Sequence, residues 1–213
     1  MAVSIEDIKK LRAMTGAGLA DVKKALTEAE GDFDKAKDLL RERGLAIAAK
    51  RSDRETSNGC VLVKSVNGFA ATIALKCETD FVANGADFIK LTSDILDAAI
   101  AAKAHTLDEV KALALGEGDV QAAVTQRSGI TGEKMELDGY NVLEGDNIEV
   151  YDHMGKHTLC TMVQLNKENA EVGHKIAMQV AAMKPIALDE TQVPQEVINN
   201  EYTVAVQKTK EEQ

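Results

Sequence analysis

The chain has 213 residues, of which 45% are apolar, and this is enough for one or two domains with a hydrophobic core. Its formal net charge is −10, and because residues 1–44 contain nine basic and nine acidic side chains, the excess negative charge lies in residues 45–213. Such a surface repels phosphate backbones, and no Lys/Arg run with interleaved aromatic residues is present. We therefore expect no direct binding to nucleic acid.

Signals for export and for membrane insertion are missing from the sequence. The first ten residues, MAVSIEDIKK, lack the apolar segment of a secretory signal peptide. No run reaches the roughly 18 apolar residues that a membrane-spanning helix needs. These features predict a cytoplasmic protein that does not interact with membranes.

Residues 1–44 predict three short helices. Leu19, Val22 and Leu26 recur at a helical spacing, and the third helix is expected to end at Gly44. Three helices in so short a segment make a small bundle of the size of a UBA-like module. Modules of this kind usually bind other proteins.

Residues 45–58 show no clear period and are predicted to be a linker. From Gly59 the pattern changes to period two, and Asn67-Gly68 separates two strand-like runs with a type I′ turn signal. This pattern predicts a β-hairpin, followed by an amphipathic helix over residues 87–102. The apolar stripe of that helix is expected to cover the hairpin and comprises Phe88, Leu91, Ile95 and Ala99.

The first core unit is expected to extend over residues 59–140. Its last part, residues 103–135, predicts two further short helices. We expect one to begin at Thr106, and the other to begin at Asp119 and to end around Ser128-Gly129.

Residues 141–193 then repeat the order of strand, turn, strand, polar loop and amphipathic helix. Val172, Ile176 and Val180 lie on one face of this second helix and are expected to be buried. The sequence thus predicts an α+β fold, in which an amino-terminal UBA-like bundle precedes a core of two β-β-α repeats.

Residues 194–213 predict a helix whose first turn contains Pro194. Its apolar side chains and the lack of a carboxyl-terminal cap indicate the start of a helical hairpin that is cut short, or alternatively a natural frayed end. The exposed faces of an interrupted coiled coil can pair between two chains and form a homodimer through this helix, or can leave the carboxyl terminus disordered.

The sequence contains no recognisable catalytic motif. Cys60, Cys77 and Cys160 lie in strand-like runs without C-x-x-C spacing, which indicates buried reduced thiols. The best metal candidate groups Cys160 with three neighbours, but its two histidines flank a Met-Gly turn, so we expect neither a metal site nor a cofactor. The three neighbours are Asp152, His153 and His157.

The segment CETDFVAN, residues 77–84, is predicted to be a polar turn that connects the hairpin to its helix, and it has an aromatic residue in its middle. Phe81 either folds back under the following helix or stays exposed. In the second case it can fill a pocket of a partner protein, with Asp80 adding negative charge at the contact. The corresponding segment of the second repeat, NKENAEV, has no aromatic residue.

Two long motifs resemble those of the elongation factor Ts family, the guanine-nucleotide exchange factors of elongation factor Tu. They are LRAMTGAGLADVKKAL, from Leu11 to Leu26, and KCETDFVAN, from Lys76 to Asn84. Further resemblance runs through EGDFDKAKDLLRERG, YDHMG and AMQVAAMKP and covers nearly the whole chain. The resemblance implies a protein that is not an enzyme and that promotes the release of GDP from elongation factor Tu.

The resemblance also implies which residues contact the partner. Asp80 and Phe81 would enter the GTPase domain of elongation factor Tu beside its Mg²⁺ and phosphate site, on a segment shaped by Thr79 and Val82. At Leu19-Ala20 the chain departs from the methionines common in the family. The remaining implied contacts are Arg12, Leu19 and Lys23 in the amino-terminal bundle, and Gly129 and His153 in the core.

Two other classes of protein compete with this interpretation. A UBA-like adaptor that binds protein partners without affecting a nucleotide would account for residues 1–44. A small enzyme could use Cys77, Glu78 or Asp80, although no base is placed near Cys77 by any spacing in the sequence.

Overall fold

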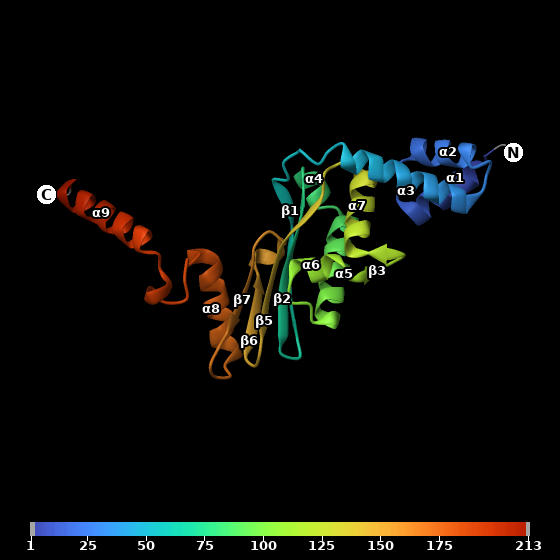
Figure 1. The fold of residues 1–213 in the computed structure, drawn as a ribbon. Coiled ribbons are helices and arrows are strands. Elements are labelled where there is room, and N and C mark those ends of the chain that lie inside the picture. The colour runs from blue at the N-terminus through green and yellow to red at the C-terminus, as the bar shows by residue number, and fades with distance from the viewer. Residues whose placement is uncertain (1–2, 212–213) are drawn as a thin grey trace.

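The structure is a computed structural model that describes residues 3–211 and shows an elongated α+β protein (Figure 1). Three helices lie at the amino-terminal end and are followed by mixed strands and helices, which confirms the expected fold class. The helices are α1 (Ile5–Thr15), α2 (Leu19–Glu28), α3 (Phe33–Ala49), α4 (Asp80–Ala83), α5 (Ala86–Ala102), α6 (Leu107–Lys111), α7 (Val120–Thr131), η1 (His153–Gly155), α8 (Ala170–Met183), η2 (Glu190–Gln192) and α9 (Gln195–Glu211). The strands are β1 (Asn58–Val66), β2 (Phe69–Cys77), β3 (Ala114–Leu115), β4 (Gly118–Asp119), β5 (Glu136–Glu144), β6 (Ile148–Asp152) and β7 (Cys160–Gln164).

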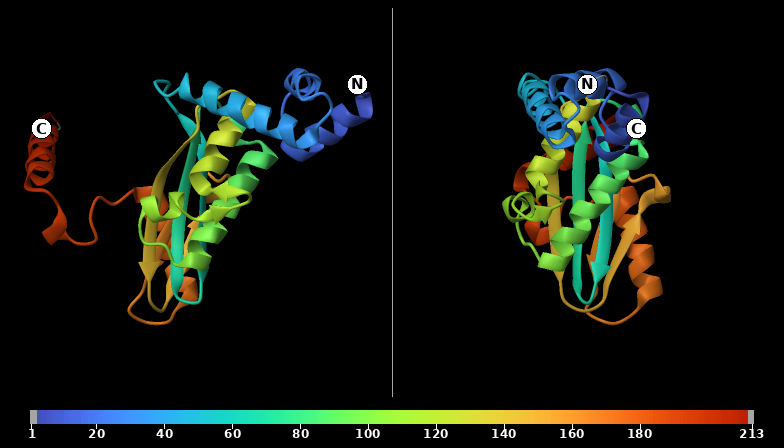
Figure 2. Two further views of the ribbon diagram at one scale, coloured as in Figure 1. Left: turned by 45° about the vertical axis from the view of Figure 1, so that its right-hand side comes forward. Right: turned by 90° about the vertical axis from the view of Figure 1, so that its right-hand side faces the viewer.

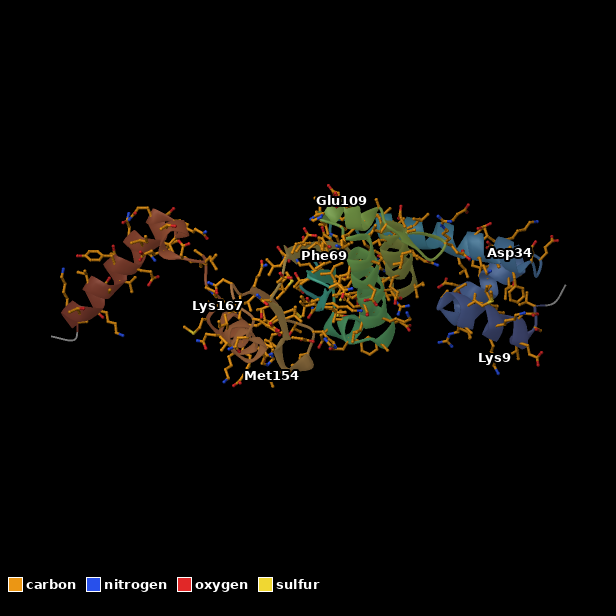
Figure 3. All side chains as sticks on the ribbon, turned by 90° about the horizontal axis from the view of Figure 1, so that it is seen from below. Lys9, Asp34, Phe69, Glu109, Met154 and Lys167 are labelled. Carbon is orange, nitrogen blue, oxygen red and sulfur yellow. The ribbon has the colours of Figure 1, made fainter. Side chains whose placement is uncertain are left out.

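Helices α1 to α3 form a small bundle with its own hydrophobic core. Leu11, Val22 and Leu26 are fully buried there. Gly16 ends α1 and Gly31 follows α2, with φ of 67° and 88°, a backbone conformation in which the lack of a Cβ avoids a steric clash. The side chains of Lys9 and Asp34 extend from this bundle into solvent (Figure 3).

Two helices continue past the glycines that were predicted to end them. Helix α3 does not end at Gly44 but runs on to Ala49, and α7 does not end at Gly129 but reaches Thr131, after which Gly132 adopts a φ of 74°. The reason is that Gly44 and Gly129 face each other where α3 crosses α7, with their backbones in contact. The lack of side chains at Gly44 and Gly129 allows the two helices to cross closely, and neither glycine ends its helix.

The central sheet has the strand order β1-β2-β5, with all neighbours antiparallel. The predicted hairpin is confirmed: Val66 pairs with Phe69, and the connecting Asn67 and Gly68 have φ of 50° and 77°, as a type I′ turn requires. Strand β5 was not predicted.

Helix α5 covers one face of this sheet, as the sequence predicts (Figure 2). Phe88, Ile95 and Ala99 are buried against Phe69 and Ile73 of β2. Figure 3 shows Phe69 inside the dense cluster of side chains at the centre of the core. Burial of this apolar surface is the main favourable term in the stability of the core.

Strands β6 and β7 form a second antiparallel pair that packs on the side of the central sheet away from α5 (Figures 1 and 2). Two hydrogen bonds connect the second pair to β1: the Val61 N–H donates to the His157 carbonyl (2.7 Å), and the Cys160 thiol donates to the Val61 carbonyl (3.3 Å). Helix α8 then packs on β6 and β7.

The buried face of α8 differs from the prediction. Val172 and Ile176 remain 43% and 39% exposed, whereas the buried positions are held by small residues. Small side chains allow the helix backbone to approach the strands closely, and the Thr161 hydroxyl donates to the Ala177 carbonyl at 2.9 Å. The buried positions of α8 are Gly173, Ala177 and Ala181.

Helix α9 begins directly after Pro194, as predicted, and projects away from the central sheet (Figure 1). None of its described residues is buried, and Ile198, Tyr202 and Val204 are among its exposed apolar side chains. No helix within residues 3–211 combines the length and the apolar character needed to cross a membrane.

The crossing of α3 and α7 makes an asymmetric prediction about its two glycines. A Cβ at Gly129 would overlap the backbone of Gly44, whereas a Cβ at Gly44 would lie 3.5 Å from the Gly129 Cα, an ordinary contact. We expect Gly129→Ala to lower the free energy of unfolding by about 1–3 kcal/mol. We expect Gly44→Ala to leave it unchanged or to raise it by up to about 1 kcal/mol, because alanine favours a helix.

Urea unfolding followed by circular dichroism measures both effects, and each variant serves as the control for the other. Equal destabilisation by the two substitutions would contradict the close crossing at Gly129.

Candidate functional site

The segment after β2 forms a short helix instead of the polar turn expected from the sequence. Cys77 ends β2 and pairs with Asn58, and α4 begins three residues later, at Asp80. Thr79 is the N-cap of α4, with extended backbone angles (φ −120°, ψ 154°), and its hydroxyl accepts a hydrogen bond from the Val82 N–H at 3.4 Å. The chain thus turns sharply from the central strand into a single helical turn.

Within α4, the aromatic side chain faces solvent and its neighbours face the core. Phe81 is 86% exposed, whereas Val82 is partly buried against the main core and Ala83 is buried. Successive helical residues point about 100° apart, so burial of Val82 and Ala83 turns Phe81 outward. Of the two alternatives for Phe81, the structure supports the exposed side chain.

The Glu133 carboxylate, which follows α7, binds the turn before α4. It accepts hydrogen bonds from the backbone N–H groups of Glu78 (3.2 Å) and Thr79 (3.1 Å), and from the Thr79 hydroxyl (2.6 Å). A single carboxylate therefore satisfies three donors at the point where the chain leaves β2. Ionised acceptors make stronger hydrogen bonds than neutral ones.

The side chain of Glu78 in turn binds the segment that contains Glu133. Its Oε1 accepts a hydrogen bond from the Lys134 N–H at 2.6 Å, and its Oε2 lies 3.0 Å from the Arg54 guanidinium. The Lys134 N–H, with a smaller contribution from Arg54, holds the pKa of Glu78 below its ordinary value. The two glutamates thus connect the end of β2 to the turn between α7 and β5 in both directions.

Asp80 combines a bound backbone with a free side chain. Its carbonyl accepts hydrogen bonds from the Asn84 N–H (3.0 Å) and from the Asn84 side-chain amide (2.8 Å). Within the described part of the chain, its exposed carboxylate makes no hydrogen bond or ion pair. The outer surface of α4 therefore presents an unpaired negative charge beside an exposed aromatic ring.

His153 lies in the turn η1 between β6 and β7 and is exposed. A hydrogen bond of 3.0 Å connects its Nδ1 to the Tyr151 hydroxyl, and the two rings meet edge to face. Beside it, Met154 is 69% exposed and has a φ of 59°. Figure 3 shows Met154 at the outer edge of the molecule.

The turn with His153 lies at the same end of the central sheet as α4. The carbonyl of His157, in this turn, accepts a hydrogen bond from Val61 near the start of β1. Asn58, the first residue of β1, pairs with the last residue of β2, immediately before α4. One end of the core therefore presents both Phe81 and His153.

The predicted contacts of the bundle are also on the surface. Arg12, Leu19 and Lys23 are exposed on α1 and α2, and Leu19 is 57% exposed. Figure 1 places the bundle toward the end of the central sheet at which α4 lies, and residues 50–57 connect α3 to the start of β1. Gly129 is different: the structure places it inside the crossing of α3 and α7, where it contacts Gly44.

The cysteines are not arranged for nucleophilic chemistry. Burial raises the pKa of Cys77 to about 11, with a smaller contribution from the charge of Glu133, so its thiol stays protonated and donates to the Thr79 carbonyl at 3.2 Å. Burial also raises the pKa of Cys60 to about 11 and that of Cys160 to about 12. The structure thus gives the thiol of Cys77 a structural hydrogen bond and no activating base.

The metal candidate around His157 is a hydrogen-bonded turn. The His157 Nδ1 lies 2.5 Å from the Asp152 Oδ2, and the Cys160 thiol donates to a backbone carbonyl. Within residues 3–211, no group of three or more His, Cys, Asp or Glu side chains is placed to hold a metal ion.

The comparison with known proteins agrees with the motifs at this site. The family model described as Elongation factor TS matches residues 78–213. The chain is 62% identical to elongation factor Ts of Parabacteroides distasonis over its full length and 64% identical to that of Bacteroides fragilis, and it covers 65% of each relative. It is 47% identical to elongation factor Ts of Porphyromonas gingivalis over 99% of its length and covers 77% of that relative.

The chain belongs to the elongation factor Ts family. It spans about two thirds of the length of the first of these relatives.

The hydrogen bonds made by the side chains of Glu133 and Glu78 were not predicted from the sequence. Glu133 is separated from Thr79 by 54 residues, and no spacing or motif connects them.

The lowered pKa of Glu78 predicts a specific dependence of stability on pH. Because the pKa is lower in the folded than in the unfolded chain, its stabilising contribution is complete above the ordinary glutamate pKa of about 4.3 and is lost as the pH falls through the folded value. We therefore expect Glu78→Gln to reduce the loss of stability between neutral and acidic pH.

Urea midpoints at a series of pH values from about 6 to about 3 measure this effect, and Glu117→Gln is the matched control. Glu117 is exposed in the turn between β3 and β4, and its side chain makes no hydrogen bond or ion pair within residues 3–211. Parallel pH dependence in the parent and Glu78→Gln would show that Glu78 does not contribute.

Proposed function

We propose that this chain binds elongation factor Tu and promotes the release of GDP, which allows GTP to be loaded. The observation that supports this most directly is the position of Phe81, 86% exposed on a firmly anchored helical turn. The residues around it belong to the segment that matches the Ts family. Exposed aromatic side chains on rigid elements are the usual anchors of protein interfaces.

In the proposed complex, Phe81 inserts into the GTPase domain of elongation factor Tu, and Asp80 brings its unpaired carboxylate with it. GDP is held in such domains by backbone N–H groups, a lysine and Mg²⁺. Mg²⁺ demands nearly ideal octahedral geometry, so a small displacement of its surroundings weakens its binding. Insertion of an aromatic ring and a negative charge beside this site therefore weakens the binding of GDP without any covalent step.

Thermodynamic linkage then sets the order of events. If the chain weakens GDP binding by some factor, GDP weakens the binding of the chain by the same factor. A coupling free energy of about 3 kcal/mol corresponds to a factor of about 150. The chain therefore prefers nucleotide-free elongation factor Tu and is displaced when GTP binds.

Other residues are proposed to extend the contact. Arg12, Leu19 and Lys23 would bind the GTPase domain from the amino-terminal bundle, and their exposure supports this. His153 would contact the partner from the same end of the core as Phe81. Gly129 would act indirectly, because its contact with Gly44 fixes the bundle relative to the core.

The finer architecture is part of the same proposal. Helices α1 to α3 would form a UBA-like bundle, and the shared order of β1, β2 and α5 with β6, β7 and α8 supports a core of two β-β-α repeats. The proposed boundaries are those predicted from the sequence, with two departures: the third helix of the bundle extends beyond residue 44, to Ala49, and β5, which pairs with β2, crosses the boundary between residues 140 and 141. Helix α9 would be part of a coiled coil.

We also propose that two chains can associate through α9. Its exposed Ile198 and Tyr202 are four residues apart and share one helical face, as side chains at a helix–helix contact do. We expect sedimentation equilibrium to show a concentration-dependent dimer and Ile198→Glu/Tyr202→Glu to shift it to the monomer. A parent chain that stays monomeric at high concentration would disprove this association.

The exchange activity is tested through Phe81. The measurement is the rate at which a fluorescent GDP analogue leaves elongation factor Tu in the presence of the parent chain or the Phe81→Ala variant. We expect the parent to accelerate release and the variant to lose on the order of 2 kcal/mol of anchoring, about 30-fold in the effective affinity. Circular dichroism checks that both proteins are folded.

The matched control is Leu188→Ala, because Leu188 is 90% exposed but lies between α8 and α9, outside the proposed contact. Its activity should equal that of the parent. If folded Phe81→Ala accelerates release as well as the parent does, Phe81 is not the anchor. If the parent itself fails to accelerate release, the proposed function is wrong for this chain.

A further inference from the structure

We propose that Glu133 is a positioning residue that fixes the direction in which Asp80 and Phe81 project toward the partner. This inference rests on the proposed exchange function. The chain's own geometry also allows Glu133 to be tested without a partner. Glu133 makes its three hydrogen bonds to Glu78 and Thr79, the two residues between β2 and α4.

The backbone at this point needs an acceptor that the sheet does not supply. Strand β2 pairs with β1 only up to Cys77 and with β5 only up to Lys76. The N–H groups of Glu78 and Thr79 therefore lie beyond the strand ladders. The Glu133 carboxylate accepts from both and takes the place of a neighbouring strand at the exit of β2.

Helix α4 cannot hold its own direction. It has four residues, far fewer than the roughly 12 that an isolated helix needs for stability in water. Its N-cap contact, from the Val82 N–H to the Thr79 hydroxyl, is long at 3.4 Å. The same hydroxyl donates to Glu133 at 2.6 Å, so Glu133 fixes the side chain that caps the helix.

Glu133 is itself held firmly after α7. The buried Ser128 hydroxyl donates to the Glu133 carbonyl at 2.5 Å, and the Glu133 N–H donates to the Thr131 hydroxyl at 3.2 Å. Gly132, with its φ of 74°, makes the turn that separates Glu133 from the helix. The carboxylate is thus attached to a fixed element of the core, from which it can orient the turn before α4.

The first test measures the turn in the free chain. Hydrogen exchange of the Glu78 and Thr79 amides, followed by NMR, is expected to become about tenfold faster or more in Glu133→Ala, because both amides lose a charged acceptor. Glu133→Gln retains one side-chain oxygen and should give an intermediate rate. The control is Glu136→Ala, whose side chain contacts Thr56 and Lys134 and not the turn before α4.

The second test measures the effect on the partner. We expect Glu133→Ala to reduce the acceleration of GDP release by about tenfold or more, while Glu136→Ala leaves it unchanged. If Glu133 acts through α4, adding Glu133→Ala to the Phe81→Ala variant should cause little further loss. A general loss of stability would instead reduce activity by the same factor in both backgrounds.

The two tests separate failure of this inference from failure of the proposed function. A parent chain that does not accelerate release removes the exchange function, and the amide measurement still decides whether Glu133 holds the turn. Unchanged amide exchange in Glu133→Ala and Glu133→Gln would overturn the inference. The inference would also be overturned if Glu133→Ala reduced activity by the same factor in the parent and in the Phe81→Ala variant. If Glu133→Ala does not fold, Glu133→Gln replaces it in both measurements.

Discussion

The hydrogen bonds of the Glu133 carboxylate to the turn after β2 are the constraint on which the exposed surface of α4 depends. Without a fixed turn, an apolar ring such as Phe81 would gain free energy by folding back against the core. Val82 and Ala83 fill the core position instead, and the firmly held Thr79 cap keeps the ring outside. The Asp80 carboxylate lies on the same helical turn and makes no hydrogen bond or ion pair within residues 3–211. A negative charge and an aromatic ring are thus presented together on a rigid support, which lowers the entropic cost of binding a partner.

Helix α7 connects this support to the amino-terminal bundle. Its last turn crosses α3 at Gly129, and the turn after it holds the end of β2 through Glu133. The bundle and the Phe81 surface are therefore fixed to the same helix from two sides. This arrangement gives a physical reason for a glycine at position 129 that differs from direct contact with a partner. It also allows two separated surfaces to engage one partner without a further loss of flexibility on binding.

Local patterns in the sequence were sufficient for much of the fold, including the hairpin with its Asn67-Gly68 turn and the buried stripe of α5. The predictions failed where the outcome depends on distant contacts. Gly44 has the features of a helix end in the sequence, and only the crossing of α7 explains why a glycine lies within α3. In α8, the small residues are buried because close packing of the helix backbone on β6 and β7 stabilises the fold more than burial of the larger side chains would. Strand β5 was missed because Gly139 and Asn141 interrupt its apolar pattern. For the candidate site, the motif identified α4, but the exposure of Phe81 depends in part on Glu133, 54 residues away from Thr79.

In the proposed complex, Phe81 enters elongation factor Tu at a place that is coupled to its nucleotide. Replacing Phe81 with the photoreactive amino acid p-benzoylphenylalanine, and Leu188 with the same residue as a control, allows the contact to be trapped by irradiation. We expect a cross-link from position 81 to the GTPase domain of nucleotide-free elongation factor Tu, and a progressive loss of that cross-link as GDP is added, because the two binding events oppose each other. Cross-linking at position 81 that is no stronger than at position 188, or that GDP leaves unchanged, would contradict it.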